Sequence, residues 1–388
     1  MKLVIFGLSV SSSWGNGHAT LWRGLLRALA KQKHQTVFFE RDVPYYAANR
    51  DLVEIPELIL YSSWDQVLPL ASSHVADADA VMVTSYCPDG AAASALCLAA
   101  RPGVTRAFYD LDTPITLERL RAGEPVPYLP EGGLAGFDIT LSFTGGAALD
   151  ELRSRLGARS VAPLYGSVDP AVHRRVPARD AYRADLSYLG THAPDRRQAL
   201  VDLFVEPARA LPSKRFVLGG SMYPADFPWT DNIWYLAHVP PPEHPAFYSS
   251  SRLTLNVTRG AMAAMGHCPS GRLFEAAACG TPIVSDYFPG LFDFFRDRSE
   301  ILVARRPEDV LDALSLSDRE LASIAEAARA RTLEEHTADR RARELVDLLG
   351  ASTASRKALS NASFEPDVAG PYATPSSRSA RTDRAVRS

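Results

Sequence analysis

Residues 269–285, Pro-Ser-Gly-Arg-Leu-Phe-Glu-Ala-Ala-Ala-Cys-Gly-Thr-Pro-Ile-Val-Ser, predict a turn, a short helix and a buried strand in succession. The helix is expected to open at Ser270 or Gly271 and to stop at Gly280, because serine favours helix starts and glycine favours helix ends. A helix start leaves backbone N–H groups unpaired at the positive end of the helix dipole. The stretch therefore predicts a phosphate site at the head of a helix in an α/β fold.

Two charged side chains of this helix extend the interpretation. Arg272 adds a cation that can hold a diphosphate in bidentate fashion. Glu275 lies one turn further on the same side, where its carboxylate can accept hydrogen bonds from a ribose diol. Phosphate and ribose contacts in this order suggest a nucleoside diphosphate. The alternative is an ordinary βαβ crossover helix whose Glu275 caps or pairs locally.

Composition limits the classes of protein. The chain has 388 residues, which suits two domains, with 46% hydrophobic and 22% charged residues as in ordinary globular proteins. The net charge of −3 gives no electrostatic argument for nucleic acid or an anionic membrane. No apolar run is long enough to span a bilayer, and residues 1–7 read as a first buried strand rather than a signal peptide. Four scattered cysteines fit reduced thiols, so we expect a cytoplasmic enzyme.

Apolar runs alternate with helical patterns in two series, which predicts parallel sheets with helices on both faces. The expected strands are 3–7, 36–40, 80–84, 106–109 and 139–143, and then 185–190, 215–219, 233–237, 253–257, 282–285 and 301–303. Two series indicate two doubly wound Rossmann-like domains with ligand in the cleft at the strand ends.

The joint between the domains is expected between residues 165 and 185, where prolines and charges replace apolar periodicity. We therefore divide the chain into a first Rossmann-like domain, 1–168, and a second Rossmann-like domain, 169–349. Residues 307–349 read as helical. Residues 350–388 are rich in Ala, Ser, Arg and Pro and are expected to form a disordered tail.

The stretch PSGRLFEAAACGTPIVSD resembles the nucleotide-sugar motif in the C-terminal domain of GT-B glycosyltransferases, particularly the retaining group-1, or family-four, type. That motif has a second Glu eight residues before the position of Glu275, and His267 stands there instead. The stretches GNGHATLWRGLLRAL, FYDLDTPITLERL, DLSYLGTHAPDRR and HVPPPEHPAFYSSSRLTLNVTRGAM resemble CgeB-like, spore-maturation glycosyltransferases over roughly residues 1–349. The resemblance implies a GT-B fold, final helices that pack back on the first domain, and sugar transfer from a nucleoside-diphosphate sugar to an acceptor.

The loop at residues 9–18 follows the first strand and opens a helix. Gly15 and Gly17 would let a ligand approach the backbone closely. His18 stands at the mouth of the helix, where an imidazole can act as a base or hold a sugar hydroxyl. In inverting GT-B enzymes a histidine of the first domain commonly deprotonates the acceptor, so the resemblance favours this role. Local capping or packing is the alternative.

Asp110 and Asp112 end a predicted strand in the same domain. Paired carboxylates suit a divalent cation, but the resemblance implies that helix dipoles and basic side chains stabilise the leaving diphosphate without metal. We therefore expect acceptor binding or acid–base work from these residues, with helix capping by Asp112 as the alternative. No metal or cofactor is expected, and the donor is expected to be of the UDP or dTDP type.

The second domain supplies the other expected donor contacts. Gly190 closes a strand, and Arg196, six positions on, can reach back to the phosphate, with Arg197 as the next choice. The resemblance implies that His238 and Val239 meet the nucleobase through main-chain groups. The catalytic set is His18, Asp110 and Asp112, and the nucleotide-sugar set is Gly15, Gly17, Gly190, Arg196, His238, Val239, Asn256, Arg259, Ser270, Gly271, Arg272 and Glu275.

Two other functions fit the same scaffold. One is a non-catalytic GT-B protein that binds nucleotide or serves as a structural protein of the spore or cell surface. The other is a nucleotide-sugar epimerase, or a phosphorylase, which would usually need a pyridoxal lysine; lysine is scarce in the second domain. The family-four motif favours retention of the anomeric configuration, whereas a His18 base favours inversion. The acceptor is left open among small molecules, glycans and proteins, as is the oligomeric state.

Overall fold

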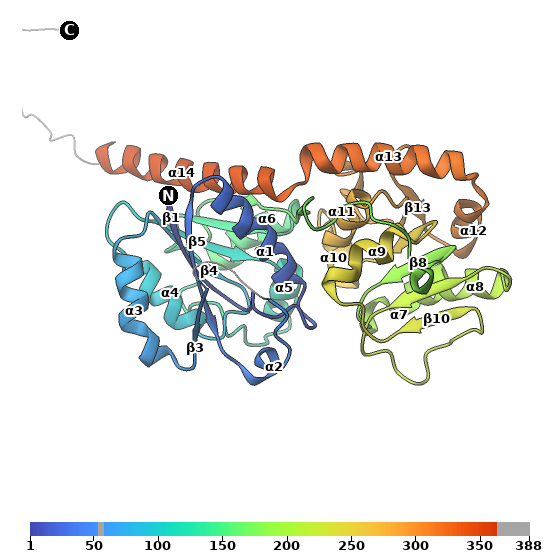
Figure 1. Ribbon diagram of the computed structural model, residues 1–388. Helices are drawn as coiled ribbons and strands as arrows, with labels where there is room; N and C mark the ends of the chain where they lie inside the picture. Colours follow the sequence, from blue (N-terminus) through green and yellow to red (C-terminus); the bar gives the residue numbers. More distant parts are fainter. Residues whose placement is uncertain (53–57, 363–388) are drawn as a thin grey trace, which may run out of the picture.

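The computed structural model describes residues 1–52 and 58–362, with side chains through residue 352, and it builds two α/β halves on separate parallel sheets (Figure 1). The first sheet has the strand order β3-β2-β1-β4-β5-β6-β7. Its strands are β1 (Lys2–Gly7), β2 (Gln35–Arg41), β3 (Leu58–Tyr61), β4 (Ala80–Thr84), β5 (Thr105–Asp110), β6 (Ile139–Ser142) and β7 (Val161–Pro163). Its helices are α1 (Gly17–Lys31), α2 (Pro44–Ala47), α3 (Trp64–Ala76), α4 (Gly90–Leu98), α5 (Thr113–Arg121) and α6 (Ala147–Leu156).

The second sheet has the order β10-β9-β8-β11-β12-β13. Its strands are β8 (Leu186–Leu189), β9 (Phe216–Gly219), β10 (Ile233–Leu236), β11 (Thr254–Asn256), β12 (Ile283–Asp286) and β13 (Leu302–Ala304). The helices are α7 (Arg197–Leu200), α8 (Glu206–Ala210), α9 (His244–Ser249), α10 (Gly260–Met265), α11 (Gly271–Ala278), α12 (Pro307–Ser315), α13 (Asp318–Glu335) and α14 (Ala338–Ala362). In each sheet the strand order reverses beside the first strand, which is the signature of a doubly wound fold and places a crevice at the strand carboxyl ends.

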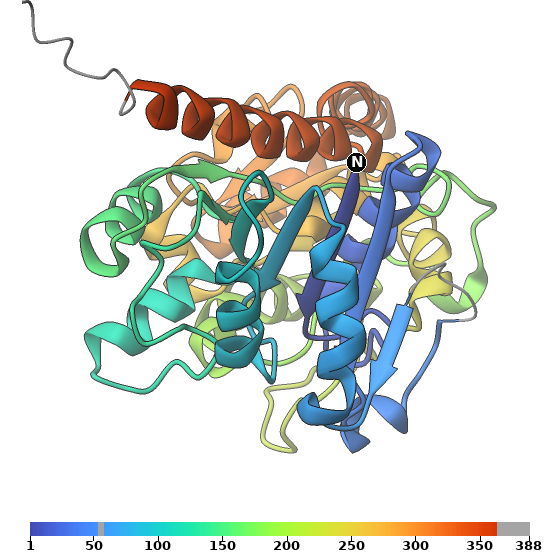
Figure 2. The same cartoon turned by 90° about the vertical axis from the view of Figure 1, so that its left-hand side faces the viewer.

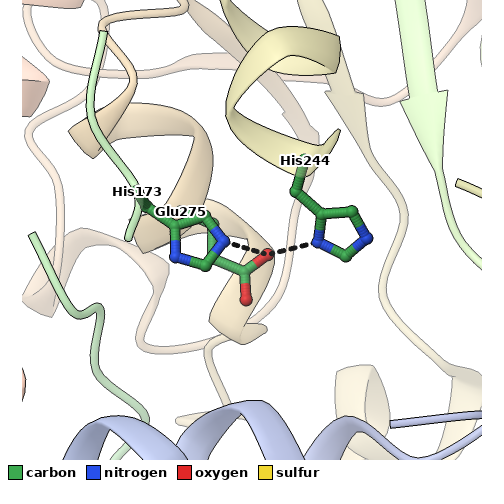
Figure 3. Close-up of side chains that lie close together, drawn as sticks. All are labelled: His173, His244 and Glu275. Atoms are coloured by element: carbon green, nitrogen blue, oxygen red, sulfur yellow. Dashed lines mark ion pairs between the residues drawn. The ribbon is translucent and has the colours of Figure 1, made fainter. Parts of the chain in front are cut away.

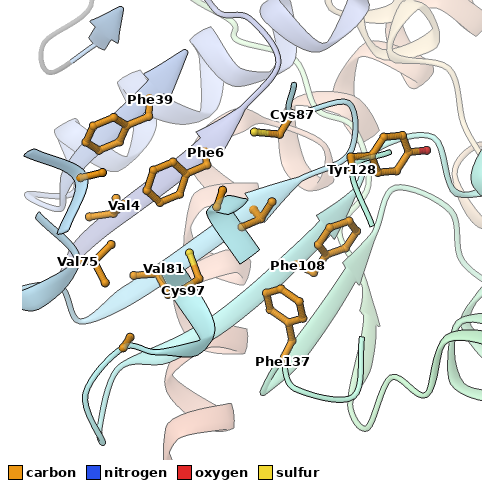
Figure 4. Packing of buried hydrophobic residues seen from close by; sticks show 14 of the residues in the cluster. Val4, Phe6, Phe39, Val75, Val81, Cys87, Cys97, Phe108, Tyr128 and Phe137 are labelled. Atoms are coloured by element: carbon orange, nitrogen blue, oxygen red, sulfur yellow. The ribbon is translucent and has the colours of Figure 1, made fainter. Parts of the chain in front are cut away.

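The first sheet is buried on both faces, which explains its nearly continuous apolar strands. Alternate residues of β1 enter different clusters: Phe6 packs with Phe39 and Val81 on one face (Figure 4), and Ile5 packs with Trp22 of α1 on the other. The four cysteines are buried and free. Within the described residues, none of the helices combines the length and apolarity needed to cross a bilayer.

Helix α14 returns from the second half and packs against the first (Figures 1 and 2). Ala338, Ala342, Leu345 and Leu349 are buried in the same cluster as Trp22. Helix α14 continues beyond residue 350, where the tail was expected to begin, and ends at Ala362; an Ala-rich stretch without proline favours that continuation. The rest of the predicted tail, residues 363–388, lies outside the described residues.

The chain crosses between the halves twice, and the two crossings are bonded to each other. The Val168 N–H donates to the His336 carbonyl at 2.9 Å, and the Ala338 N–H donates to the Val168 carbonyl at 2.8 Å. The halves are thus joined by one short paired segment along the side that carries α13 and α14.

Candidate functional site

A cavity of about 600 Å³ lies between the two halves, at the carboxyl ends of both sheets. Loop and helix starts of the first half face the end of β8, the 238–244 segment and helices α10 and α11 of the second half. The predicted residues that line the cavity are Gly15, Gly17, His18, Asp112, Gly190, Arg196, His238, Val239, Arg259, Ser270, Gly271, Arg272 and Glu275. Asp110 and Asn256 do not line it.

Helix α11 points its first turn into the cavity. Ser270 is the N-cap, and its Oγ accepts a hydrogen bond from the Arg272 N–H at 3.4 Å. Leu273, Phe274 and the alanines behind them are buried in the core of the second half, so the opposite side of the helix presents Gly271, Arg272 and Glu275 to the cavity. The free N–H groups of this turn suit an anion.

Arg272 is held against the end of β8. Its guanidinium donates to the Leu189 carbonyl, and its Nε lies 3.1 Å from Ser270 Oγ. A Cβ atom on Gly190 would collide with this guanidinium. Position 190 therefore requires a glycine, because any larger side chain would occupy the space of the Arg272 guanidinium.

Arg196 lies on the same wall and is buried, with 8% of its surface exposed. One of its guanidinium nitrogens donates to the Thr191 carbonyl, while Nε is buried without a partner. Burial lowers the pKa of Arg196. Among the described side chains, neither Arg196 nor Arg272 has a carboxylate within ion-pair distance, although Glu275 acts on Arg272 over a longer distance. By contrast, Arg259 pairs with Asp195 at 3.4 Å.

Glu275 has two histidines beside it that the sequence analysis missed (Figure 3). Its Oε2 lies 3.9 Å from His173 Nε2 and 4.0 Å from His244 Nδ1. Burial raises the pKa of Glu275 against the opposing effects of His244 and Arg272. Burial lowers the pKa of His173 to about 4 and also lowers that of His244. At neutral pH both imidazoles are therefore neutral.

On the opposite wall, His18 and Asp112 form a pair. Helix α1 starts at Gly17 because the Asn16 side chain caps it, accepting from the His18 N–H at 3.0 Å. The His18 ring reaches Asp112, with 2.9 Å between Nε2 and Oδ2. Burial opposes ionisation of Asp112, but the hydrogen bond from His18 and the charges of His18 and Arg259 together outweigh it, and the pKa of Asp112 is lowered. An ionised carboxylate can only accept, so Nε2 carries the hydrogen; Nδ1 is buried without a hydrogen-bond partner among the described residues.

The serine-rich loop that leads to His18 is fastened by Glu40, a residue the sequence analysis did not select. Glu40 is 1% exposed and accepts from Ser9 Oγ at 2.9 Å and from the N–H groups of Val10 and Ser11 at 2.7 and 2.9 Å. These serines therefore shape the loop by bonding to a buried carboxylate from the next strand. His238 in turn meets the loop across the cavity, with its ring 4.7 Å from that of Trp14.

The structure departs from two expectations about site residues. Asp110 is fully buried behind Asp112, whose N–H donates to Asp110 Oδ1 at 3.0 Å, and burial raises the pKa of Asp110 to about 6. Asn256 is buried at the end of β11 and donates to Ser285 Oγ at 3.0 Å, so it braces neighbouring strands. Both side chains stabilise the cavity wall from behind.

His267 occupies the position of the first Glu in the motif that the sequence resembles, but it does not line the cavity. It has a φ of 45°, and its Nδ1 lies 2.9 Å from Asp293. Its carbonyl accepts from the Gly145 N–H at 2.9 Å. This position therefore forms a contact between the two halves.

Comparisons with known proteins agree with this architecture. Residues 196–347 match the family described as glycosyl transferase-like. No curated protein sequence matches the chain. Sucrose-phosphate synthase from Thermosynechococcus elongatus superposes with a TM-score of 0.63 at 13% identity, over 93% of this chain and 100% of that one.

Two further structures superpose similarly. HepE from Anabaena, in complex with UDP-glucose, gives a TM-score of 0.61 at 13% identity, over 90% of this chain and 100% of that one. An α-glucosyltransferase in complex with UDP and DNA gives 0.64 at 13% identity, over 90% of this chain and 99% of that one. The predicted fold is confirmed: two Rossmann-like domains in the GT-B arrangement.

Proposed function

We propose that this protein is a glycosyltransferase of the CgeB-like kind, which moves a sugar from a nucleoside-diphosphate sugar to an acceptor without a metal ion. One observation carries the proposal: anion- and ribose-binding groups gather on one wall of the cavity, opposite a His–Asp pair on the other. The match of residues 196–347 to a glycosyl transferase-like family supports it. UDP in the HepE and α-glucosyltransferase complexes makes a uridine nucleotide our first choice of donor.

The donor's diphosphate would lie at the start of α11. As the bond between the anomeric carbon and the phosphate oxygen breaks, its electron pair stays with the diphosphate, whose negative charge grows. The N–H groups at Gly271 and the charges of Arg196 and Arg272 are already aimed at this place, and such preorganised donors are typically worth about 2.7–4 kcal/mol each. Glu275 would accept hydrogen bonds from the ribose, and the main chain at His238 and Val239 would meet the base.

The acceptor would bind on the side of the first half. There its oxygen attacks the anomeric carbon and its proton passes to the His18–Asp112 pair. We assign the proton to the imidazole of His18, which lines the cavity and which Asp112 holds in place through Nε2. This arrangement favours a single displacement with inversion, and His267 outside the cavity weakens the case for the family-four retaining motif.

The first experiment is a thermal-shift screen of the full chain with UDP, dTDP, GDP and ADP, and with their sugars. A diphosphate at 100 times its dissociation constant should add about 2.7 kcal/mol to the stability of the folded state. Failure of every diphosphate to raise the melting temperature would contradict the proposal.

Turnover of the selected donor is then measured with and without EDTA. Sugar release or transfer that persists in EDTA is expected. Binding without turnover for any acceptor would favour the non-catalytic alternative, and interconversion of the donor sugar would favour an epimerase. If EDTA abolished transfer and magnesium restored it, the metal-independent mechanism would be wrong.

A further inference from the structure

Three potential metal ligands converge at the side of the cavity that the second half forms (Figure 3). His173 comes from the segment that joins the two halves, His244 is the first residue of α9, and Glu275 lies in α11. One ligating atom of each residue lies within 4.8 Å of the other two. Each side chain comes from a different element, so the convergence is a property of the fold.

The atoms that face one another have no hydrogen-bond partner among the described residues. His244 Nε2 lies 3.1 Å from the Val239 carbonyl, which can only accept, so Nε2 holds the hydrogen and Nδ1 is bare. Nδ1 of His244 and Nε2 of His173 are both buried without a hydrogen-bond partner. Their distances to Glu275, 4.0 and 3.9 Å, are too long for hydrogen bonds.

Polar atoms that are buried without partners carry a cost in free energy unless a group that they can all bind lies between them. The imidazoles do not supply the charge themselves, because burial lowers the pKa of both. Neutral imidazole is also the form that binds metal ions. A backbone carbonyl that holds the far nitrogen, as Val239 holds His244, is the usual outer contact of a metal-binding histidine.

We propose that His173, His244 and Glu275 bind a zinc ion through two imidazole nitrogens and one carboxylate oxygen, with the fourth position open to the cavity. Two histidines and a glutamate are a known zinc-ligand set. Bonds from zinc to nitrogen and oxygen are about 2.0–2.1 Å long, so a tetrahedral arrangement places the ligand atoms roughly 3.3 Å apart. Each imidazole must therefore approach the carboxylate by roughly 0.6–0.7 Å, and the two imidazole nitrogens, which lie within 4.8 Å of each other, must come closer by up to about 1.5 Å. Magnesium and calcium prefer more numerous oxygen ligands, so they are poor occupants.

Zinc at this site would use the carboxylate that we assign to the donor's ribose. Zinc and the donor should therefore exclude each other, and zinc is an inhibitor rather than a cofactor. This exclusion rests on the proposed function, whereas zinc binding itself does not.

Zinc binding is tested on the full chain after removal of metals with EDTA and dialysis. Zinc is titrated in competition with a chromophoric chelator, and one ion per chain is expected. His173→Gln and His244→Gln should each lower the affinity by more than the roughly 10–100-fold that loss of an outer contact costs. His192→Gln is the matched control, because its Nε2 is also buried and unpartnered but lies outside the cluster. Unchanged zinc affinity in both folded cluster variants would overturn the proposal.

Two further measurements keep the test informative if those variants do not fold. Zinc-edge X-ray absorption of the wild-type protein should show two imidazoles and oxygen around the ion, and a shell without imidazole would overturn the site. UDP is then titrated into zinc-free and zinc-loaded protein, where zinc should weaken UDP binding. UDP binding without zinc binding would refute the metal site alone, and zinc binding without UDP binding would refute the proposed donor alone.

Discussion

Glu275→Gln should weaken UDP binding and at the same time stabilise the ligand-free protein. The carboxylate has no hydrogen-bond partner among the described residues and faces the cavity, so in the complex it would accept from the ribose hydroxyls. A hydrogen bond to a charged group contributes roughly 1.5–3 kcal/mol, and the neutral amide oxygen of Gln would keep roughly 0.5–1.5 kcal/mol of it. The expected loss in affinity is therefore on the order of 10-fold.

The effect on stability has the opposite sign. Burial raises the pKa of Glu275 from 4.5, even though His244 and Arg272 favour its ionised form. Its favourable contribution to folding is therefore fully present below pH 4.5 and is lost as the pH rises through the raised pKa. Gln cannot ionise, so the variant should gain in melting temperature relative to wild type as the pH rises above that range.

Both effects are measurable on the same samples. Calorimetry compares UDP with an analogue that lacks both ribose hydroxyls, and melting curves are recorded from acid to neutral pH. The wild type should discriminate against the analogue more strongly than the variant does. Glu308→Gln, at an exposed position on α12, is the control. A folded Glu275→Gln variant that retains full UDP affinity, or a wild type that binds both nucleotides equally, would refute the reasoning.

Three other predictions concern the cavity walls. Arg196→Gln should weaken UDP binding by roughly 10-fold or more and should have little effect on uridine binding, because the Arg196 charge has no carboxylate partner and is free to bind the diphosphate. If calorimetry showed equal losses of affinity for UDP and uridine, Arg196 would have only a structural role. His18→Ala should lower turnover by roughly 10²–10⁴-fold with UDP affinity nearly unchanged, and Asp112→Asn should act in the same direction. A product of retained anomeric configuration, determined by NMR, would contradict a His18 base. Asp110→Asn should raise the free energy of unfolding by on the order of 3 kcal/mol above pH 6 and should have little effect below pH 3.8. The reason is that burial raises the pKa of this carboxyl to about 6, so the wild type is destabilised only where Asp110 must ionise. A difference in melting temperature that does not change with pH would show this to be wrong.

Local patterns were enough to predict much of the fold. The Ser-Gly start and the glycine stop of α11 are signals within a few residues of the helix, and the structure begins that helix at Gly271. The two series of apolar runs predicted two parallel sheets, because strands buried on both faces lose the alternation of polar and apolar residues. The cleft followed from a general rule of doubly wound sheets.

Contacts between distant segments were beyond such patterns. Nothing near His173 indicates that it meets Glu275, about 100 residues further on, since their approach depends on how the joining segment lies against α11. The same holds for Glu40, which fastens a loop some 30 residues earlier. Asp110 and Asn256 were placed on the correct strand ends, but the side on which each points depends on the packing of neighbouring strands.

Helix α14 has a consequence for how the chain is made. The last strand of the first half ends at residue 163. The apolar cluster that contains the buried side of α1 is completed only when α14 adds its buried residues, Ala338, Ala342, Leu345 and Leu349. At typical rates of synthesis that interval is roughly 10–40 s. During this time the nascent first half exposes an unfinished apolar surface, so its folding ends after translation of the second half, and a ribosome stalled before residue 338 would display a natural substrate for chaperones.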